Sequence, residues 1–181
     1  MLKELFCDNI LGEISCSSVH GRRFVRLKEC GKGAKLKMVD LLDIPDESLV
    51  LKMDTYEQPS TLFRGQKGEN KRCDYVLITH LDNRDIILFI ELKSTDLNDN
   101  EVKRQFMGAE CAIDYCNAAL KRFHNQDCYF DSFDKRFVVF HKAGSIAKRP
   151  TRAKALNNNV SSRYLKYPHP HEPSIRELVR A

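Results

Sequence analysis

The sequence predicts a single domain that mixes helices and strands (α/β or α+β), with a central mixed sheet flanked by helices. Three observations predict it: adjacent apolar segments at residues 73–80 and 85–93, a long amphipathic segment that begins near Asn98, and another apolar segment at residues 136–141. The apolar segments are rich in residues that favour strands. A helix between two strands of one sheet indicates a right-handed crossover.

The composition is that of an ordinary globular protein. The chain has 181 residues, of which 42% are hydrophobic and 30% are charged. No apolar run approaches the ~18 residues that a membrane crossing requires, so we expect a cytoplasmic protein without a membrane partner. The 7 cysteines are odd in number and irregularly spaced, so we expect reduced thiols and no zinc site.

The N-terminal third has the weakest pattern. Residues 12–18 and 22–30 are expected to form a hairpin, because turn-forming residues separate two strand-like segments. Residues 34–42 show a weak helical spacing, which Pro45 would end.

The segments at residues 73–80 and 85–93 are expected to form a hairpin at the centre of the sheet. Both are apolar on both faces, which is typical of strands covered from two sides. Residues 81–84, Leu-Asp-Asn-Arg, have turn chemistry and would place His80 opposite Asp85.

Two helices are expected after this hairpin. The first is long, with Asn98 as its N-cap and Glu101 completing the capping pattern. Its apolar face is expected to comprise Val102, Phe106, Ala109, Ile113, Cys116, Leu120 and Phe123. Gln105 lies on the shoulder of this face, near the expected end of the preceding strand. A capping box at Ser174 and Glu177 predicts a short last helix.

The register of the hairpin brings two acidic residues and a lysine together. Asp74 is expected opposite Glu91, and Lys93 shares their face because side chains alternate along a strand. Opposed carboxylates repel each other unless a cation lies between them. Mg²⁺, with Mn²⁺ as a substitute, fits this need, and the backbone carbonyl of Leu92 is a natural third ligand. Lys93 would orient or deprotonate a metal-bound water. The alternative is a structural cluster of ion pairs.

These residues resemble the PD-(D/E)xK nuclease superfamily, which has the restriction-endonuclease-like fold. The resemblance covers residues 71–141 and rests on Asp74, on the motif Glu91-Leu-Lys93 and on the long helix that follows. It implies a core in the order helix, three strands, helix, strand, and a metal-dependent hydrolysis of phosphodiester bonds. Cys73 stands where the family motif has proline, a departure that leaves the chemistry untouched.

The resemblance also implies further site residues. Gln105 is similar to a glutamine of the branch related to the RecB nuclease domain, and Tyr115 is a less regular match to a tyrosine further along that helix. Such a glutamine would steady a water or a phosphate, whereas an ordinary surface glutamine is the alternative. Many members supply a glutamate from their first helix, for which Glu13, Glu47 and Glu57 are all candidates.

The charge is unevenly distributed along the chain. The net charge is +5, but residues 135–181 hold eleven basic against two acidic residues, a balance of +9. We take residues 1–141 as the core, and residues 142–181 as a basic segment that is part of the same domain or an arm. Such a segment favours a nucleic-acid partner, whereas a solvated tail is the alternative. The residues expected to contact phosphates are Lys142, Lys148, Arg149, Arg152, Lys154, Arg163 and Lys166.

The sequence therefore predicts a Mg²⁺-dependent nuclease, with an endonuclease acting on DNA favoured. The resemblance implies a place in a restriction, repair or phage-defence system. No base-reading motif is present, so a protein partner or a second copy would supply specificity. The alternatives are a nuclease-like subunit that binds nucleic acid or assembles without cutting, and a structural domain with an ion cluster.

Overall fold

The computed structural model describes residues 2–16, 21–29, 36, 38–55, 62–94, 97–126, 129–142, 158–169 and 172–180. The strands are β1 (Ile14–Cys16), β2 (Arg23–Leu27), β3 (Val39–Leu42), β4 (Leu49–Lys52), β5 (Tyr75–Leu81), β6 (Arg84–Lys93), β7 (Asp134–Lys142) and β8 (Leu165–His169). The helices are α1 (Asp99–His124) and α2 (Ile175–Val179), with short 3₁₀ helices η1 (Leu2–Leu5), η2 (Asp8–Ile10) and η3 (Met53–Thr55).

The strands form two sheets. The central sheet has five strands in the order β4-β5-β6-β7-β8, and the smaller sheet has three strands in the order β1-β2-β3. β4, β5 and β6 are antiparallel neighbours, whereas β7 and β8 continue the sheet in parallel. The prediction of a single domain with a central mixed sheet is confirmed.

The predicted hairpin of β5 and β6 is present with the predicted register. His80 pairs with Asp85. Asp82 and Asn83 form the turn, both in the left-handed region with φ of 51° and 59°, as in a two-residue type I′ turn. β5 begins later than the predicted strand, so Asp74 lies immediately before it.

α1 begins as predicted, at a side-chain cap. Asn98 Oδ1 accepts hydrogen bonds from the backbone N–H groups of Asn100 and Glu101. Along the predicted apolar face, Cys116 is half-buried and the other residues as far as Leu120 are buried. Its extension to Phe123 is wrong, because the whole last turn of the helix is exposed and the Phe123 side chain is 79% accessible.

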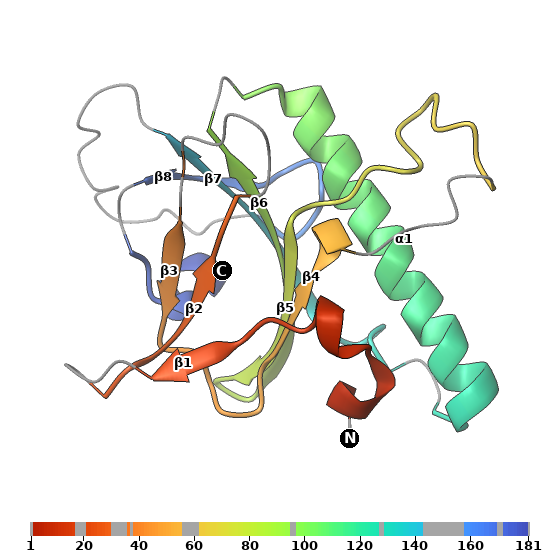
Figure 1. The fold of residues 1–181 in the computed structure, drawn as a ribbon, viewed down its shortest axis with the longest axis horizontal. Coiled ribbons are helices and arrows are strands. Elements are labelled where there is room, and N and C mark those ends of the chain that lie inside the picture. Colours follow the sequence, from red (N-terminus) through yellow and green to blue (C-terminus); the bar gives the residue numbers. More distant parts are fainter. Residues whose placement is uncertain are drawn as a thin grey trace.

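Each face of the central sheet packs against a different layer (Figure 1). α1 covers one face, where Phe137 stacks on Phe89 at 4.8 Å between ring centroids and meets Phe106 edge-on at 5.3 Å. The other face packs against β1–β3 and α2, with Leu88 and Ile90 in that core. Among the described helices, none is long and apolar enough to cross a membrane.

The smaller sheet corrects one prediction. The hairpin of β1 and β2 is present, but residues 39–42 form β3 beside β2 and not the end of a helix. Val39 and Leu41 are buried, whereas Asp40 points outward and binds Arg26 through hydrogen bonds of 2.8 and 2.6 Å. This alternation is that of a half-buried strand, and pairing with β2 outweighs the weak helical spacing.

The C-terminal residues complete the same core. β8 extends the central sheet, and α2 begins at the predicted cap, where Ser174 Oγ accepts from the N–H of Arg176. Buried Asn158 donates hydrogen bonds to the carbonyls of Phe137 (3.3 Å) and Leu178 (3.2 Å). Asn158 therefore joins β7 to α2.

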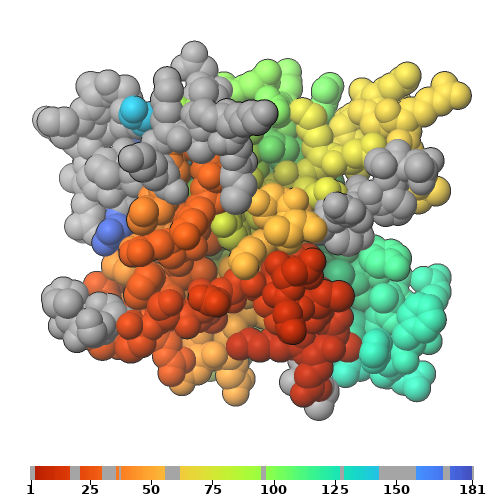
Figure 2. All heavy atoms as spheres, in the orientation of Figure 1, coloured from red at the N-terminus to blue at the C-terminus, as the bar shows by residue number. Residues whose placement is uncertain are grey.

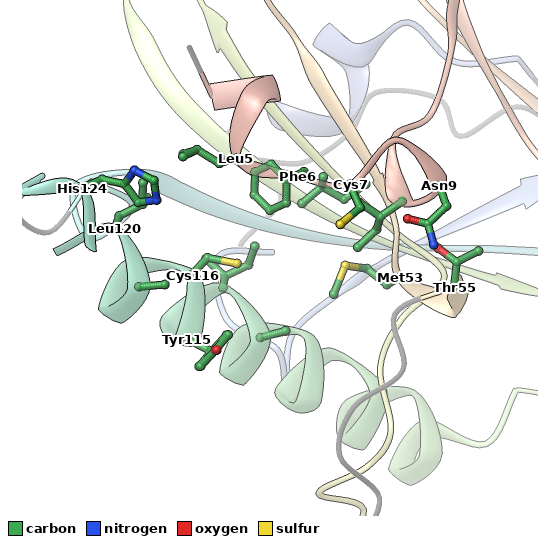
Figure 3. A pocket seen from close by; sticks show the side chains of 15 residues that line it. Leu5, Phe6, Cys7, Asn9, Met53, Thr55, Tyr115, Cys116, Leu120 and His124 are labelled. Atoms are coloured by element: carbon green, nitrogen blue, oxygen red, sulfur yellow. The ribbon is translucent and has the colours of Figure 1, made fainter. Parts of the chain in front are cut away.

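The N-terminal residues border a hollow beside α1. Figure 2 shows them in red and orange across the face of the molecule, next to the teal end of α1. A cavity of about 610 Å³ lies between η1, η2, η3 and α1, with Phe6, Met53 and Leu120 in its lining (Figure 3). Its lining is mostly apolar and does not include Asp74 or Glu91, so it is separate from the acidic pair.

Candidate active site

The carboxyl end of β6 carries a buried carboxylate beside a lysine. Glu91 and Lys93 alternate with Leu92 and therefore point to the face that α1 covers. The Glu91 side chain is only 1% exposed, and its Oε1 lies 2.8 Å from Lys93 Nζ. The Lys93 side chain is 18% exposed. The buried acid is thus paired with a cation that reaches the surface.

Asp74 approaches this pair from the start of β5. Its Oδ2 accepts a hydrogen bond of 2.7 Å from the N–H of Leu92, and its backbone carbonyl accepts one of 2.8 Å from Met53. The N–H and C=O of a strand residue point toward the same neighbouring strand. The carbonyl of Leu92 therefore faces the side on which Asp74 lies.

Gln105 on α1 faces the acidic pair. Its side chain lowers the pKa of Glu91 and so favours the ionised carboxylate, and its Oε1 is buried without a hydrogen-bond partner among the described residues. Tyr115 lies elsewhere on α1, where it is 65% exposed and borders the apolar cavity. The structure therefore places Gln105, and not Tyr115, with Asp74, Glu91 and Lys93.

Burial dominates the electrostatics of the two acids. It raises the pKa of Asp74, helped by the charges of Asp54 and Glu29 and opposed by the Leu92 N–H and by Lys93. Burial and the charge of Asp74 raise the pKa of Glu91, against the stabilising effects of Lys93 and Gln105. Burial acts to lower the pKa of Lys93, but its contacts with Glu91, together with the charges of Glu101 and Asp74, outweigh burial and raise it. Both carboxyl groups therefore hold a proton more readily than exposed carboxyl groups do in the absence of a bound cation.

The donor set fits a hard divalent cation. Glu91 Oε2 is buried and accepts no hydrogen bond from any part of the chain that the structure describes. Within those same residues, no three His, Cys, Asp or Glu side chains gather as a metal cage. Mg²⁺ commonly binds one or two carboxylates together with waters and substrate phosphate. Asp74, Glu91 and the carbonyl of Leu92 thus suit Mg²⁺.

The additional acids near the site are not those considered from the sequence. Glu13 and Glu47 are exposed, with Glu47 preceding the end of β4 that is remote from Asp74, and Glu57 lies outside the described residues. Glu29 and Asp54 are the acids whose charges act on Asp74. The only sequence feature that pointed to Glu29 was its position at the end of an expected strand. No sequence feature pointed to Asp54.

Three of the proposed phosphate-contacting residues can be placed. Lys166 is in register with Val139, which is in register with Glu91, so Lys166 lies two strands from Glu91, roughly 10 Å away on the same face. Its Nζ pairs with Asp99 at 2.9 Å. Lys142 is exposed and is the last residue of β7, at the same end of the sheet as Lys93.

Of the remaining basic residues, the structure describes Arg163. Arg163 is exposed in the turn before β8, where its N–H bonds to the carbonyl of Val160 at 2.9 Å. Lys148, Arg149, Arg152 and Lys154 lie outside the described residues. The structure therefore places Lys142 at the end of the sheet that carries Lys93, and Lys166 on the sheet face that carries Glu91.

Comparison with known proteins finds no matching family model, no matching curated protein and no matching solved structure.

Proposed function

We propose that the protein is a metal-dependent nuclease that hydrolyses phosphodiester bonds, with Mg²⁺ or Mn²⁺ as cofactor and DNA as the favoured substrate. One observation carries this proposal: Glu91 is buried, its Oε2 has no hydrogen-bond partner among the described residues, and Asp74 and Lys93 converge on it. A buried carboxylate oxygen in this state costs free energy unless a ligand satisfies it.

Each side chain has a distinct task in this proposal. When bound, Mg²⁺ supplies Lewis acidity and lowers the pKa of a bound water. Asp74 and Glu91 hold the cation, with the carbonyl of Leu92 as a third ligand. Gln105 opposes the rise in the pKa of Glu91 and would help to orient its carboxylate. Lys93 orients the attacking water and offsets the negative charge that develops on the phosphate.

The element order also supports the proposal. After β4, β5 and β6 come α1 and the parallel strand β7, as the resemblance to the PD-(D/E)xK superfamily implies for three strands, a helix and a strand. The implied helix before the first of these strands has no counterpart in the described residues before β4, where 3₁₀ helices and the smaller sheet lie. The support therefore comes from the part of the fold that carries the acids.

The basic residues indicate the class of substrate. Lys142 ends β7 and Lys166 lies on β8, both on the same side of β6, and a polyanion is the ligand that such charges attract. Contacts of this kind bind the backbone and carry little sequence information. We therefore propose that a protein partner or a second copy of the chain supplies sequence specificity. A role in restriction, repair or phage defence is part of this proposal.

The proposal is tested by incubating the protein with single- and double-stranded DNA and RNA in Mg²⁺, Mn²⁺ or EDTA. Cleavage of DNA in either metal and none in EDTA is the expected result. Circular substrates separate endonuclease from exonuclease activity. Salt-dependent binding without cleavage of any substrate would instead support a non-catalytic nucleic-acid-binding subunit.

A further inference from the structure

A carboxylate from the segment that follows β2 accepts hydrogen bonds from the residue that follows Lys93. Glu29 Oε1 accepts a hydrogen bond of 3.0 Å from the N–H of Ser94, and Glu29 Oε2 accepts one from Ser94 Oγ. The N–H of Leu36 donates to Ser94 Oγ at 2.7 Å and to Glu29 Oε2 at 3.3 Å. Ser94 is buried, with 9% of its surface exposed.

The same end of β2 also holds the start of β5. The hydroxyl of Tyr75 accepts from the N–H of Lys28 and donates to the carbonyl of Lys28, both at 3.0 Å. Tyr75 follows Asp74, and Ser94 follows Lys93. The consecutive residues Lys28 and Glu29 therefore bind Tyr75 and Ser94, the residues that follow Asp74 and Lys93 in the chain.

These contacts act from the face opposite to α1. Side chains alternate along β6, so Glu91 and Lys93 point toward α1 while Leu92 points toward the core shared with the smaller sheet. The pairing of β6 with β7 ends at Lys93 and His141. Beyond this last pair, the bonds from Glu29 to Ser94 hold the end of β6.

We propose that Glu29 is a positioning residue that acts through Ser94: it fixes the carboxyl end of β6 and thereby the directions of Glu91 and Lys93. This inference rests on the proposed function. In metal sites, loss of a partner that orients a ligand typically lowers metal affinity or activity by roughly 10- to 100-fold. The smaller sheet is then part of the catalytic apparatus and more than a cover for the core.

The chain offers a matched control at the other end of β5. Ser48 Oγ and Thr79 Oγ1 form a buried hydrogen bond of 2.7 Å, remote from Asp74. Ser48→Ala removes a serine hydroxyl from a buried hydrogen bond, as Ser94→Ala does. A loss of general stability affects both variants, whereas a loss of positioning affects only the variant at Ser94.

The test compares Ser94→Ala, Ser94→Thr and Glu29→Gln with Ser48→Ala and the wild type. Three quantities are measured: the affinity for Mg²⁺ alone by calorimetry, kcat and KM for DNA cleavage, and Tm. Ser94→Ala keeps the Glu29 charge, so it separates positioning from electrostatic attraction of the metal. We expect it to lower Mg²⁺ affinity and kcat by roughly 10-fold with little change in KM. Ser94→Thr, which retains the hydroxyl, should recover most of both.

The inference is wrong if Ser94→Ala and Glu29→Gln bind Mg²⁺ like the wild type, or if Ser48→Ala weakens binding equally. A wild-type protein that binds Mg²⁺ without cleaving nucleic acid refutes the proposed function alone, because Mg²⁺ affinity still decides the role of Glu29. A wild-type protein that binds no Mg²⁺ refutes both.

Discussion

Lys93→Ala is expected to lower the rate of DNA cleavage by roughly 10²- to 10⁴-fold, the range for loss of a positioned proton-transfer or charge-stabilising group. The substitution removes the ammonium group that lies 2.8 Å from Glu91 Oε1. It also removes a positive charge from beside the proposed cation, so Mg²⁺ affinity should not fall. Cleavage rates and Mg²⁺ calorimetry on the same preparation check both statements.

Lys135→Ala is the matched control for this substitution. Lys135 pairs with Glu110 of α1 at 3.3 Å, also between the sheet and the helix, but at the start of β7. It should keep wild-type cleavage and lose at most about 1 kcal/mol of stability. If Lys93→Ala cleaves at the wild-type rate, or if both variants lose activity equally, Lys93 has no catalytic role.

Gly108→Ala is expected to destabilise the protein, although alanine is the better helix former. An added Cβ would overlap the carbonyl oxygen of Lys71, a backbone atom that cannot move aside as a side chain can. Overpacking typically costs about 1–3 kcal/mol and occasionally more, whereas the gain in helix propensity is about 1 kcal/mol. We expect a net loss of about 2 kcal/mol in urea unfolding.

This loss should extend to the candidate site, because the segment that Gly108 packs against leads directly to Asp74. Mg²⁺ affinity should therefore fall at a temperature at which the variant is still folded. Cys111→Ala, at an exposed position of the same helix, is the control and should change stability by less than about 0.5 kcal/mol. An unchanged or more stable Gly108→Ala protein would contradict the close approach of α1 to residues 71–72.

The centre of the fold could be predicted because its signals are local. The hairpin turn at Asp82 and Asn83 sets the register of β5 and β6, and this register places Asp74 near Glu91. The cap at Asn98 and the spacing of apolar residues define α1. Gln105 could be placed near the site because it lies about two helical turns from the capped end, on the shoulder of the apolar face.

The remaining features depend on contacts between distant parts of the chain. β3 has a weak pattern of its own and becomes a strand by pairing with β2, and the short β4 is fixed by β5. Glu29 reaches Ser94 across 65 residues of sequence, so no spacing rule could connect them. Phe123 matches the helical period but is exposed. The prediction failed there because the period of a helix does not show where the layer that covers it ends.

The central claim is that Asp74 and Glu91 hold a divalent cation, and calorimetric titration with Mg²⁺ tests it most directly. In the metal-free protein, burial raises the pKa of Asp74 to about 6 and that of Glu91 to about 8. Near neutral pH the pair therefore retains a proton that Mg²⁺ must displace. We predict binding that releases protons and strengthens as the pH rises toward 8, and that Glu91→Gln abolishes. Absence of binding, or binding that Glu91→Gln leaves unchanged, would contradict the claim.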